Sequence, residues 1–151
     1  GMCLAWLTRS EMELKRGNIV LAQMLIADTI QLCTTRGDKI ILAAALETYV
    51  SIAVADGEFI AGAEAFGEST YLRARTSSVP AYVDRPQLDT AVAALEMELG
   101  RRQFELYRER GKQKQMRAIW TEVASPDFLS IVRVSSSGTP DCKRTSRTKL
   151  L

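Results

Sequence analysis

The residues best suited to chemistry in this chain are two pairs of carboxylates, Glu64 with Glu68 and Glu105 with Glu109. Acids four residues apart lie on one face of a helix, where they could exchange protons with a substrate or bind a hard cation. Arginines stand within helical contact distance of the second pair, so a surface network of weak ion pairs explains it as well. We therefore interpret both pairs as solvated helix faces.

Histidine is absent from all 151 residues. This excludes Ser-His-Asp and Cys-His nucleophiles, HExxH zinc sites and imidazole acids or bases. The string GAEAFGES at residues 62–69 has the spacing of a phosphate-binding loop, but Glu68 stands where a lysine would neutralise phosphate. Gly62 and Gly67 are better explained by close helix packing. We predict a protein that is not an enzyme, with no catalytic residue, no metal ligand and no cofactor.

Basic residues gather in the last third of the chain. Residues 101–151 hold 12 Lys and Arg against 5 Asp and Glu, whereas residues 1–100 hold 8 against 13. Such a stretch could contact the phosphates of a nucleic acid or serve as a partner surface. The candidate surface consists of Arg101, Arg102, Arg108, Arg110 and Lys112. No recognition-helix motif accompanies these residues. We therefore favour the interpretation that they form an exposed helix followed by a flexible basic end, and nucleic-acid binding is the second interpretation.

The elements that must position these residues are predicted to be helices. Glycines recur at positions 17, 37 and 57, and each is followed by a polar or acidic residue, Asn18, Asp38 or Glu58. A glycine just past a helix end can adopt the left-handed conformation, and its neighbour can cap the next helix. The segments between carry apolar residues at helical spacing, without strand-like alternation. The sequence therefore predicts an all-α fold.

A shift of 40 residues superposes the second predicted helix on the fourth. Small residues match small ones and large match large at Gly17/Gly57, Ile19/Phe59, Ala22/Gly62, Ile26/Phe66, Ala27/Gly67, Asp28/Glu68 and Leu32/Leu72. This pattern is typical of helix hairpins that stack to cover one another's apolar faces. We expect antiparallel hairpins at 3–36 and 39–75, a shorter pair at 84–111 and a closing helix to 124. Residues 1–134 form this helical domain, and 135–151 form a polar, basic, flexible tail.

Two classes of residue are expected to form the core. The segments 19–36 and 40–55 are apolar around most of their circumference, which favours helices packed on two sides. Aromatic residues at helical spacing are predicted to make core or inter-hairpin contacts: Tyr49, Phe59, Phe66, Tyr71, Phe104, Tyr107 and Trp120. Gly111 is expected to separate the short helix that carries Phe104 from the closing helix.

Residues in both halves of the chain resemble known helical repeats. Trp6, Gly17, Ile19, Ala22 and Ile26 are similar to the tetratricopeptide signature. Residues 57–123 resemble the tetratricopeptide-like C-terminal helical region of LuxR-type and maltose-activator-like bacterial transcriptional regulators. The resemblance is carried by Gly57, Glu58, Gly62, Ala63, Phe66, Gly67, Leu72 and Arg73, the loop with Pro80 and Pro86, then Ala93, Ala94, Leu95, Leu99, Gly100, Phe104, Arg110 and Gly111.

This resemblance implies a superhelix of hairpins whose concave face receives a protein partner or a small effector. It implies a non-catalytic interaction or sensing module of a transcriptional regulator. Incomplete capping of such a stack predicts self-association as a homodimer. Nucleic-acid binding through the basic C-terminal third is the alternative function.

Cysteine usage and hydropathy bear on the compartment. Cys3, Cys33 and Cys142 are odd in number, far apart in sequence and without a CxxC motif, so neither a disulfide framework nor a thiolate metal site is expected. The most apolar stretch, residues 40–46, is far shorter than the roughly 20 residues that span a bilayer. We predict a cytoplasmic protein with no membrane partner.

Overall fold

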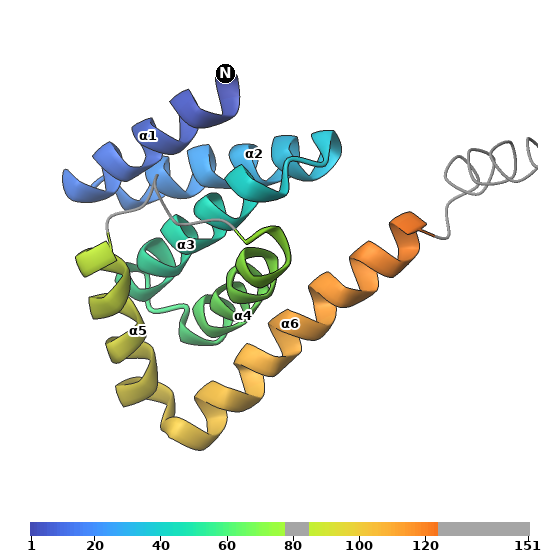
Figure 1. The fold of residues 1–151 in the computed structure, drawn as a ribbon. Helices are drawn as coiled ribbons and strands as arrows, with labels where there is room; N and C mark the ends of the chain where they lie inside the picture. Colours follow the sequence, from blue (N-terminus) through green and yellow to red (C-terminus); the bar gives the residue numbers. More distant parts are fainter. Residues whose placement is uncertain (78–84, 124–151) are drawn as a thin grey trace, which may run out of the picture. The chain divides into compact units, whose positions relative to one another are not determined.

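A computed structural model describes residues 1–77 and 85–123 (Figure 1). These residues form six α-helices and no strand, so the predicted all-α class is confirmed. The helices are α1 Met2–Lys15, α2 Ile19–Arg36, α3 Lys39–Ala55, α4 Phe59–Thr76, α5 Arg85–Leu99 and α6 Arg101–Val123. The predicted tail at 135–151 and the domain limit at 134 lie outside the described residues.

The chain divides into two compact units, Gly1–Gln115 and Met116–Leu151, and the boundary falls within α6. The first unit contains α1 to α5 and the N-terminal part of α6. In the second, residues 116–123 continue α6, and Trp120 is 69% exposed. The expectation that Trp120 packs in the core is therefore wrong.

The glycines spaced 20 residues apart end their helices as predicted. Gly17, Gly37 and Gly57 all have positive φ angles, 84°, 74° and 79°. The predicted side-chain caps are confirmed only in part: Asp38 accepts a hydrogen bond from the Ile41 backbone N–H at 3.1 Å, whereas Asn18 makes no such bond. The Asn18 amide instead donates to the buried Glu13 carboxylate at 2.7 Å, which directs that side chain back onto α1.

Helix α3 forms the centre of the first unit. It packs against α1, α2, α4 and α5, and Figure 1 shows it between α2 and α4. Its residues 42–48 are all buried, which matches its nearly continuous apolar sequence. The similar prediction for 19–36 is confirmed only in part: α2 packs against both α1 and α3, but its fully buried residues form a single face. On its other side Val20 and Met24 are 71% and 61% exposed.

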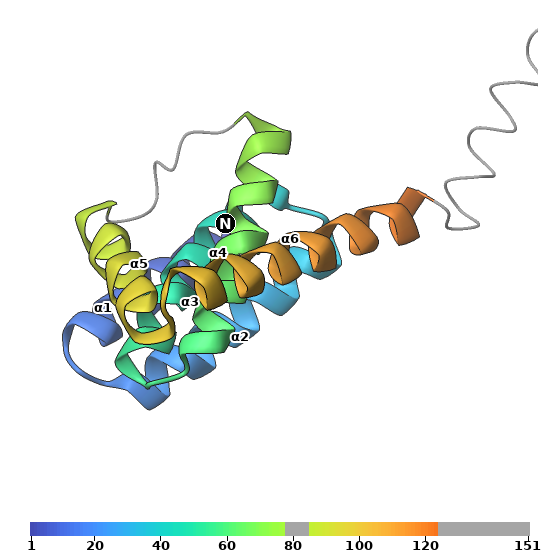
Figure 2. The same ribbon diagram turned by 90° about the horizontal axis from the view of Figure 1, so that it is seen from below.

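Helix α6 runs without a break through Gly111, which corrects the prediction of two helices separated there. Gly111 is buried, and its Cα lies directly against the carbonyl group of Glu64 on α4. In the same way Gly67 of α4 lies against the carbonyl group of Arg108 on α6. Figure 2 shows the ribbon of α6 crossing that of α4. Close packing at Gly67 is thus confirmed, and Gly111 permits backbone contact instead of ending a helix.

Candidate functional site

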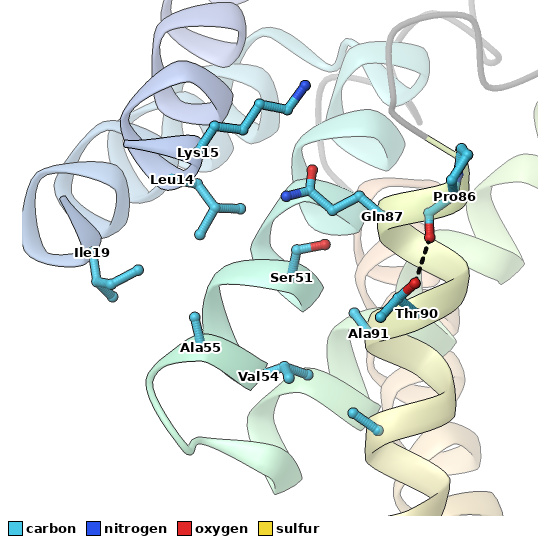
Figure 3. Close-up of a pocket in the computed structure, with 11 residues that line it drawn as sticks. Leu14, Lys15, Ile19, Ser51, Val54, Ala55, Pro86, Gln87, Thr90 and Ala91 are labelled. Carbon is cyan, nitrogen blue, oxygen red and sulfur yellow. Dashed lines mark hydrogen bonds between the residues drawn. The ribbon is translucent and has the colours of Figure 1, made fainter. Parts of the chain in front are cut away.

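An open groove of about 590 Å³ runs between α1, α3 and α5 (Figure 3). We call it the α1/α3/α5 groove. Figure 3 shows α1 and α5 as its two walls, with Leu14 and Gln87 pointing toward each other across it and Ser51 rising from α3. The lining residues are Leu14, Lys15, Ile19, Ser51, Val54, Ala55, Pro86, Gln87, Thr90, Ala91 and Ala94.

Short side chains at helical spacing create this groove. Ala91 and Ala94 of α5 and Ser51 and Ala55 of α3 stand three or four residues apart and face the same space. Because none of them reaches far, the facing helices leave a slot between them that larger side chains would fill. The groove therefore results from small side chains at the positions where the helices face one another.

The groove offers mainly apolar contacts with a few polar groups. Its lining is mainly aliphatic, with the Ser51 hydroxyl, the Gln87 amide and the Lys15 ammonium as its principal polar groups. Among the residues that the structure describes, no carboxylate and no thiol lines the groove. An apolar slot with a few polar groups at its edges is the usual form of a ligand or peptide site.

The five basic residues predicted as a candidate surface all belong to α6, and none of them lines the α1/α3/α5 groove. Arg108 forms an ion pair with Glu105 at 2.8 Å, whereas Arg110 lies 3.7 Å from Glu64 and 5.2 Å above the Tyr107 ring. Arg101 and Arg102 are exposed. The structure therefore brings only Arg108 and Lys112 to a common hollow.

That hollow is a second cleft, of about 390 Å³, between α4 and α6. We call it the α4/α6 cleft. It is lined by Gly67, Thr70, Tyr71, Ala74, Arg108, Glu109 and Lys112. Sequence reasoning missed the α4 side of this cleft, because the site depends on where two helices cross. The signal that could have revealed it is the pair Gly67 and Gly111, which marks the crossing point.

The carboxylates Glu64 and Glu68 are not the solvated pair that was expected. Glu68 is 8% exposed and accepts a hydrogen bond from the Gln115 amide at 2.8 Å. Burial raises the pKa of the Glu68 carboxyl, while the Gln115 hydrogen bond and the Lys114 ammonium act in the opposite direction. Glu64 and Glu68 thus join α4 to α6, through Arg110 and Lys114 respectively, each at 3.7 Å.

Comparison of the chain with protein-family models, curated proteins and solved structures gives no match. Among residues 1–77 and 85–123, no three or more His, Cys, Asp or Glu side chains are grouped to hold a metal ion. None of the helices that the structure describes combines the length and apolar character needed to cross a membrane.

Proposed function

We propose that this chain is a non-catalytic protein-interaction or effector-sensing module, and that its partner binds in the α1/α3/α5 groove. The observation that carries the proposal is the position of the groove. Its lining comes mainly from α1, α3 and α5, with Ile19 from the start of α2, and α1, α3 and α5 would be the first helices of the three hairpins expected from the sequence. Alternate helices of a hairpin stack line the surface that such modules present to partners.

The lining indicates the kind of partner. Val54, Ala55, Ala91 and Ala94 offer apolar contacts, so the partner should insert one or two aliphatic or aromatic side chains. The Ser51 hydroxyl and the Gln87 amide can hydrogen-bond to its main chain. A short peptide segment of a protein supplies both features.

We propose further that the module belongs to a bacterial transcriptional regulator. The support is the resemblance of residues 57–123 to the helical region of LuxR-type and maltose-activator-like proteins. In such a regulator, occupation of the groove would be communicated to a DNA-binding part.

The groove proposal is tested by selecting binders from a displayed peptide library on the full chain and measuring their affinity for two matched variants. Thr90→Arg places a long cation in the groove, whereas Ala93→Arg makes a similar change at an exposed position of the same helix outside it. We expect Thr90→Arg to weaken selected peptides by about tenfold or more and Ala93→Arg to leave them unchanged. Equal affinity of the peptides for both variants would contradict binding in the α1/α3/α5 groove.

Nucleic-acid binding is the second candidate, and one observation favours it. Arg101, Arg102 and Lys112 are exposed on one helix and have no carboxylate partner among the described residues. Binding to generic duplex DNA that falls steeply with salt and disappears when Arg101, Arg102 and Arg110 are neutralised would support this candidate. Failure of the chain to be retained on heparin would count against it.

A further inference from the structure

The α4/α6 cleft opens beside a contact between two helix backbones. At this contact Gly67 meets the carbonyl group of Arg108, and Gly111 meets that of Glu64. Helices this close at one point separate on either side of it, and the side chains there decide whether the space is filled. On the side toward Ala74, the α4 residues Thr70 and Ala74 are small, so the space of about 390 Å³ stays open.

The two walls of the cleft differ in chemistry. The α4 wall offers the half-buried ring of Tyr71 beside Thr70 and Ala74. The α6 wall offers two cations one helical turn apart, Arg108 and Lys112. A flat aromatic surface that faces a pair of positive charges is complementary to a molecule that is itself flat at one end and anionic at the other.

The charges on the α6 wall differ in how far they are already paired. The Arg108 guanidinium donates from Nε at 3.0 Å and from Nη2 at 2.8 Å to one oxygen of Glu105, which fixes its plane. The Lys112 ammonium has no carboxylate partner among the described residues. Glu109 also lines the cleft, and its carboxylate accepts a hydrogen bond from the Gln113 amide at 2.8 Å.

We propose that the α4/α6 cleft binds a small aromatic carboxylate or sulfonate. The ring of the ligand lies against Tyr71 and Ala74, and its anionic group binds the Lys112 ammonium beside the Arg108 guanidinium. This site is separate from the α1/α3/α5 groove, so the inference does not rest on peptide binding there. It identifies a place and a chemical class for an effector.

A ligand in the α4/α6 cleft would contact both α4 and α6, so its binding should affect how stably the two helices pack together. A molecule that binds only the docked arrangement of the two helices stabilises that arrangement by mass action. Occupation should therefore raise the melting temperature of the chain and slow hydrogen exchange at the α4 and α6 amides around the crossing.

The test uses 2-naphthoate as the anionic probe and 2-naphthamide, of the same shape without the charge, as its control. Binding is measured on the full chain by calorimetry and by the shift in melting temperature. We expect 2-naphthoate to bind and to raise the melting temperature, and 2-naphthamide to bind at least about tenfold more weakly, since the amide loses a charge-assisted contact.

Three variants locate the probe. Lys112→Gln removes the unpaired cation and should weaken 2-naphthoate about tenfold, and Ala74→Leu should block it by filling the cleft. Arg101→Gln removes an exposed cation of the same helix outside the cleft and should change nothing. Three results would each overturn the proposal: no binding of 2-naphthoate, equal binding of the amide, or binding that survives both Lys112→Gln and Ala74→Leu. Competition by inorganic phosphate as strong as that of 2-naphthoate would also overturn it, because the ring would then not be recognised.

Discussion

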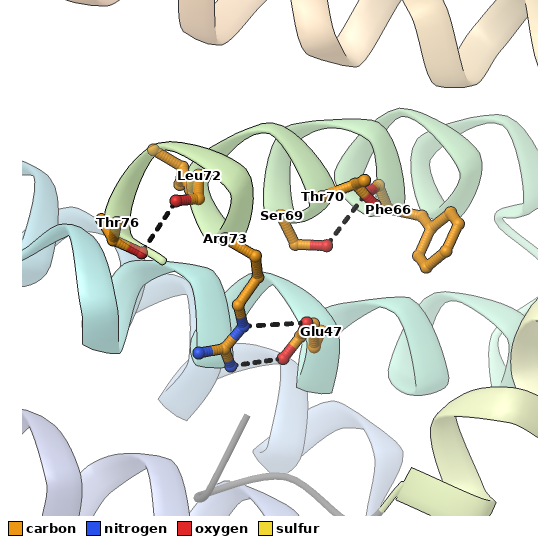
Figure 4. Close-up of polar contacts among 7 residues, drawn as sticks. All are labelled: Glu47, Phe66, Ser69, Thr70, Leu72, Arg73 and Thr76. Carbon is orange, nitrogen blue, oxygen red and sulfur yellow. Dashed lines mark hydrogen bonds and ion pairs between the residues drawn. The ribbon is translucent and has the colours of Figure 1, made fainter. Parts of the chain in front are cut away.

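Arg73 of α4 reaches Glu47 of α3 with two hydrogen bonds, from Nη2 to one carboxylate oxygen at 2.6 Å and from Nε to the other at 3.2 Å (Figure 4). The pair is almost fully enclosed, with side chains 11% and 4% exposed. A planar guanidinium that meets both carboxylate oxygens is a directional contact, which a lysine could not reproduce. It fixes the register of the second hairpin, whose α3 forms the floor of the α1/α3/α5 groove.

Removing one partner of this ion pair should destabilise the protein strongly. Arg73→Met leaves the Glu47 carboxylate buried without its cation, and we expect a loss of about 3–5 kcal/mol in the free energy of unfolding, measured with urea. Arg75→Met is the matched control, because Arg75 is exposed and lies 5.8 Å above the Tyr71 ring, a contact of about 0.5–1 kcal/mol. Similar losses of unfolding free energy in the two variants would contradict the prediction that the buried ion pair with Glu47 stabilises the fold more than an exposed arginine does.

The backbone contact between α4 and α6 leaves no space for a methyl group at Gly67. A Cβ atom added at Gly67 overlaps the carbonyl group of Arg108, and backbone cannot move aside as a side chain can. Although alanine favours a helix by about 1 kcal/mol over glycine, we expect Gly67→Ala to lower the free energy of unfolding by about 1–3 kcal/mol. It should also expose α6 to limited proteolysis.

Gly62→Ala is the comparison for this prediction. Its added Cβ would lie 3.2 Å from a methyl of Leu95 and 3.3 Å from the Ala53 Cβ, contacts that a small adjustment relieves. We expect a smaller loss of stability than in Gly67→Ala, and unchanged protease resistance of α6. A stable Gly67→Ala protein with α6 still protected would contradict the close contact.

Glu68 should make stability depend on pH. Its pKa is raised in the folded protein, so the neutral carboxyl is favoured by folding, and this contribution is lost as pH rises through the raised pKa. Glu68→Gln stays neutral at every pH and can still accept the Gln115 hydrogen bond. The variant should therefore be more stable than the parent near pH 7, with the difference vanishing below about pH 4. Glu98→Gln on the exposed surface of α5 controls for the loss of one negative charge. A Glu68→Gln protein that is less stable near pH 7 would contradict the prediction.

Cys33 should be unreactive until the protein unfolds. Burial and a hydrogen bond to the Cys3 thiol raise its pKa to about 12, so the thiolate fraction at pH 8 is about a thousandfold below that of a free cysteine. In a Cys142→Ser chain, Ellman's reagent should react with Cys3 and Cys33 at the rate of unfolding, and rapidly in urea. Immediate reaction of the native chain would contradict their burial. These two residues are far apart in sequence, yet both belong to one core cluster.

The first four helices could be predicted closely because their ends are encoded locally. A glycine with positive φ at 17, 37 or 57 needs no knowledge of the rest of the fold, and the helices begin and end within a residue or two of the expected limits. Gly111 could not be interpreted in the same way. A glycine either ends a helix or admits another backbone, and only the position of Glu64, distant in sequence, shows which applies.

Burial was harder to predict than helix position, even within the repeat. Ala22 and Gly62 are both buried, as the shift of 40 residues implies, but Ala27 is exposed whereas Gly67 is buried. Asp28 and Glu68 differ in the same way. The reason is that α6 covers this face of α4, whereas the equivalent face of α2 is exposed. The ion pair of Arg110 with Glu64 could not be predicted for the same reason, because it depends on where α6 crosses α4.

The most direct test of the groove follows alanine methyl signals by NMR while a selected peptide is added to the full chain. Ala55, Ala91 and Ala94 line the α1/α3/α5 groove, whereas Ala27, Ala74 and Ala93 are exposed elsewhere. We expect the first three signals to shift together with one affinity and the other three to stay in place. Shifts confined to Ala27, Ala74 or Ala93, with the groove signals unmoved, would contradict the assignment of the partner site to this groove.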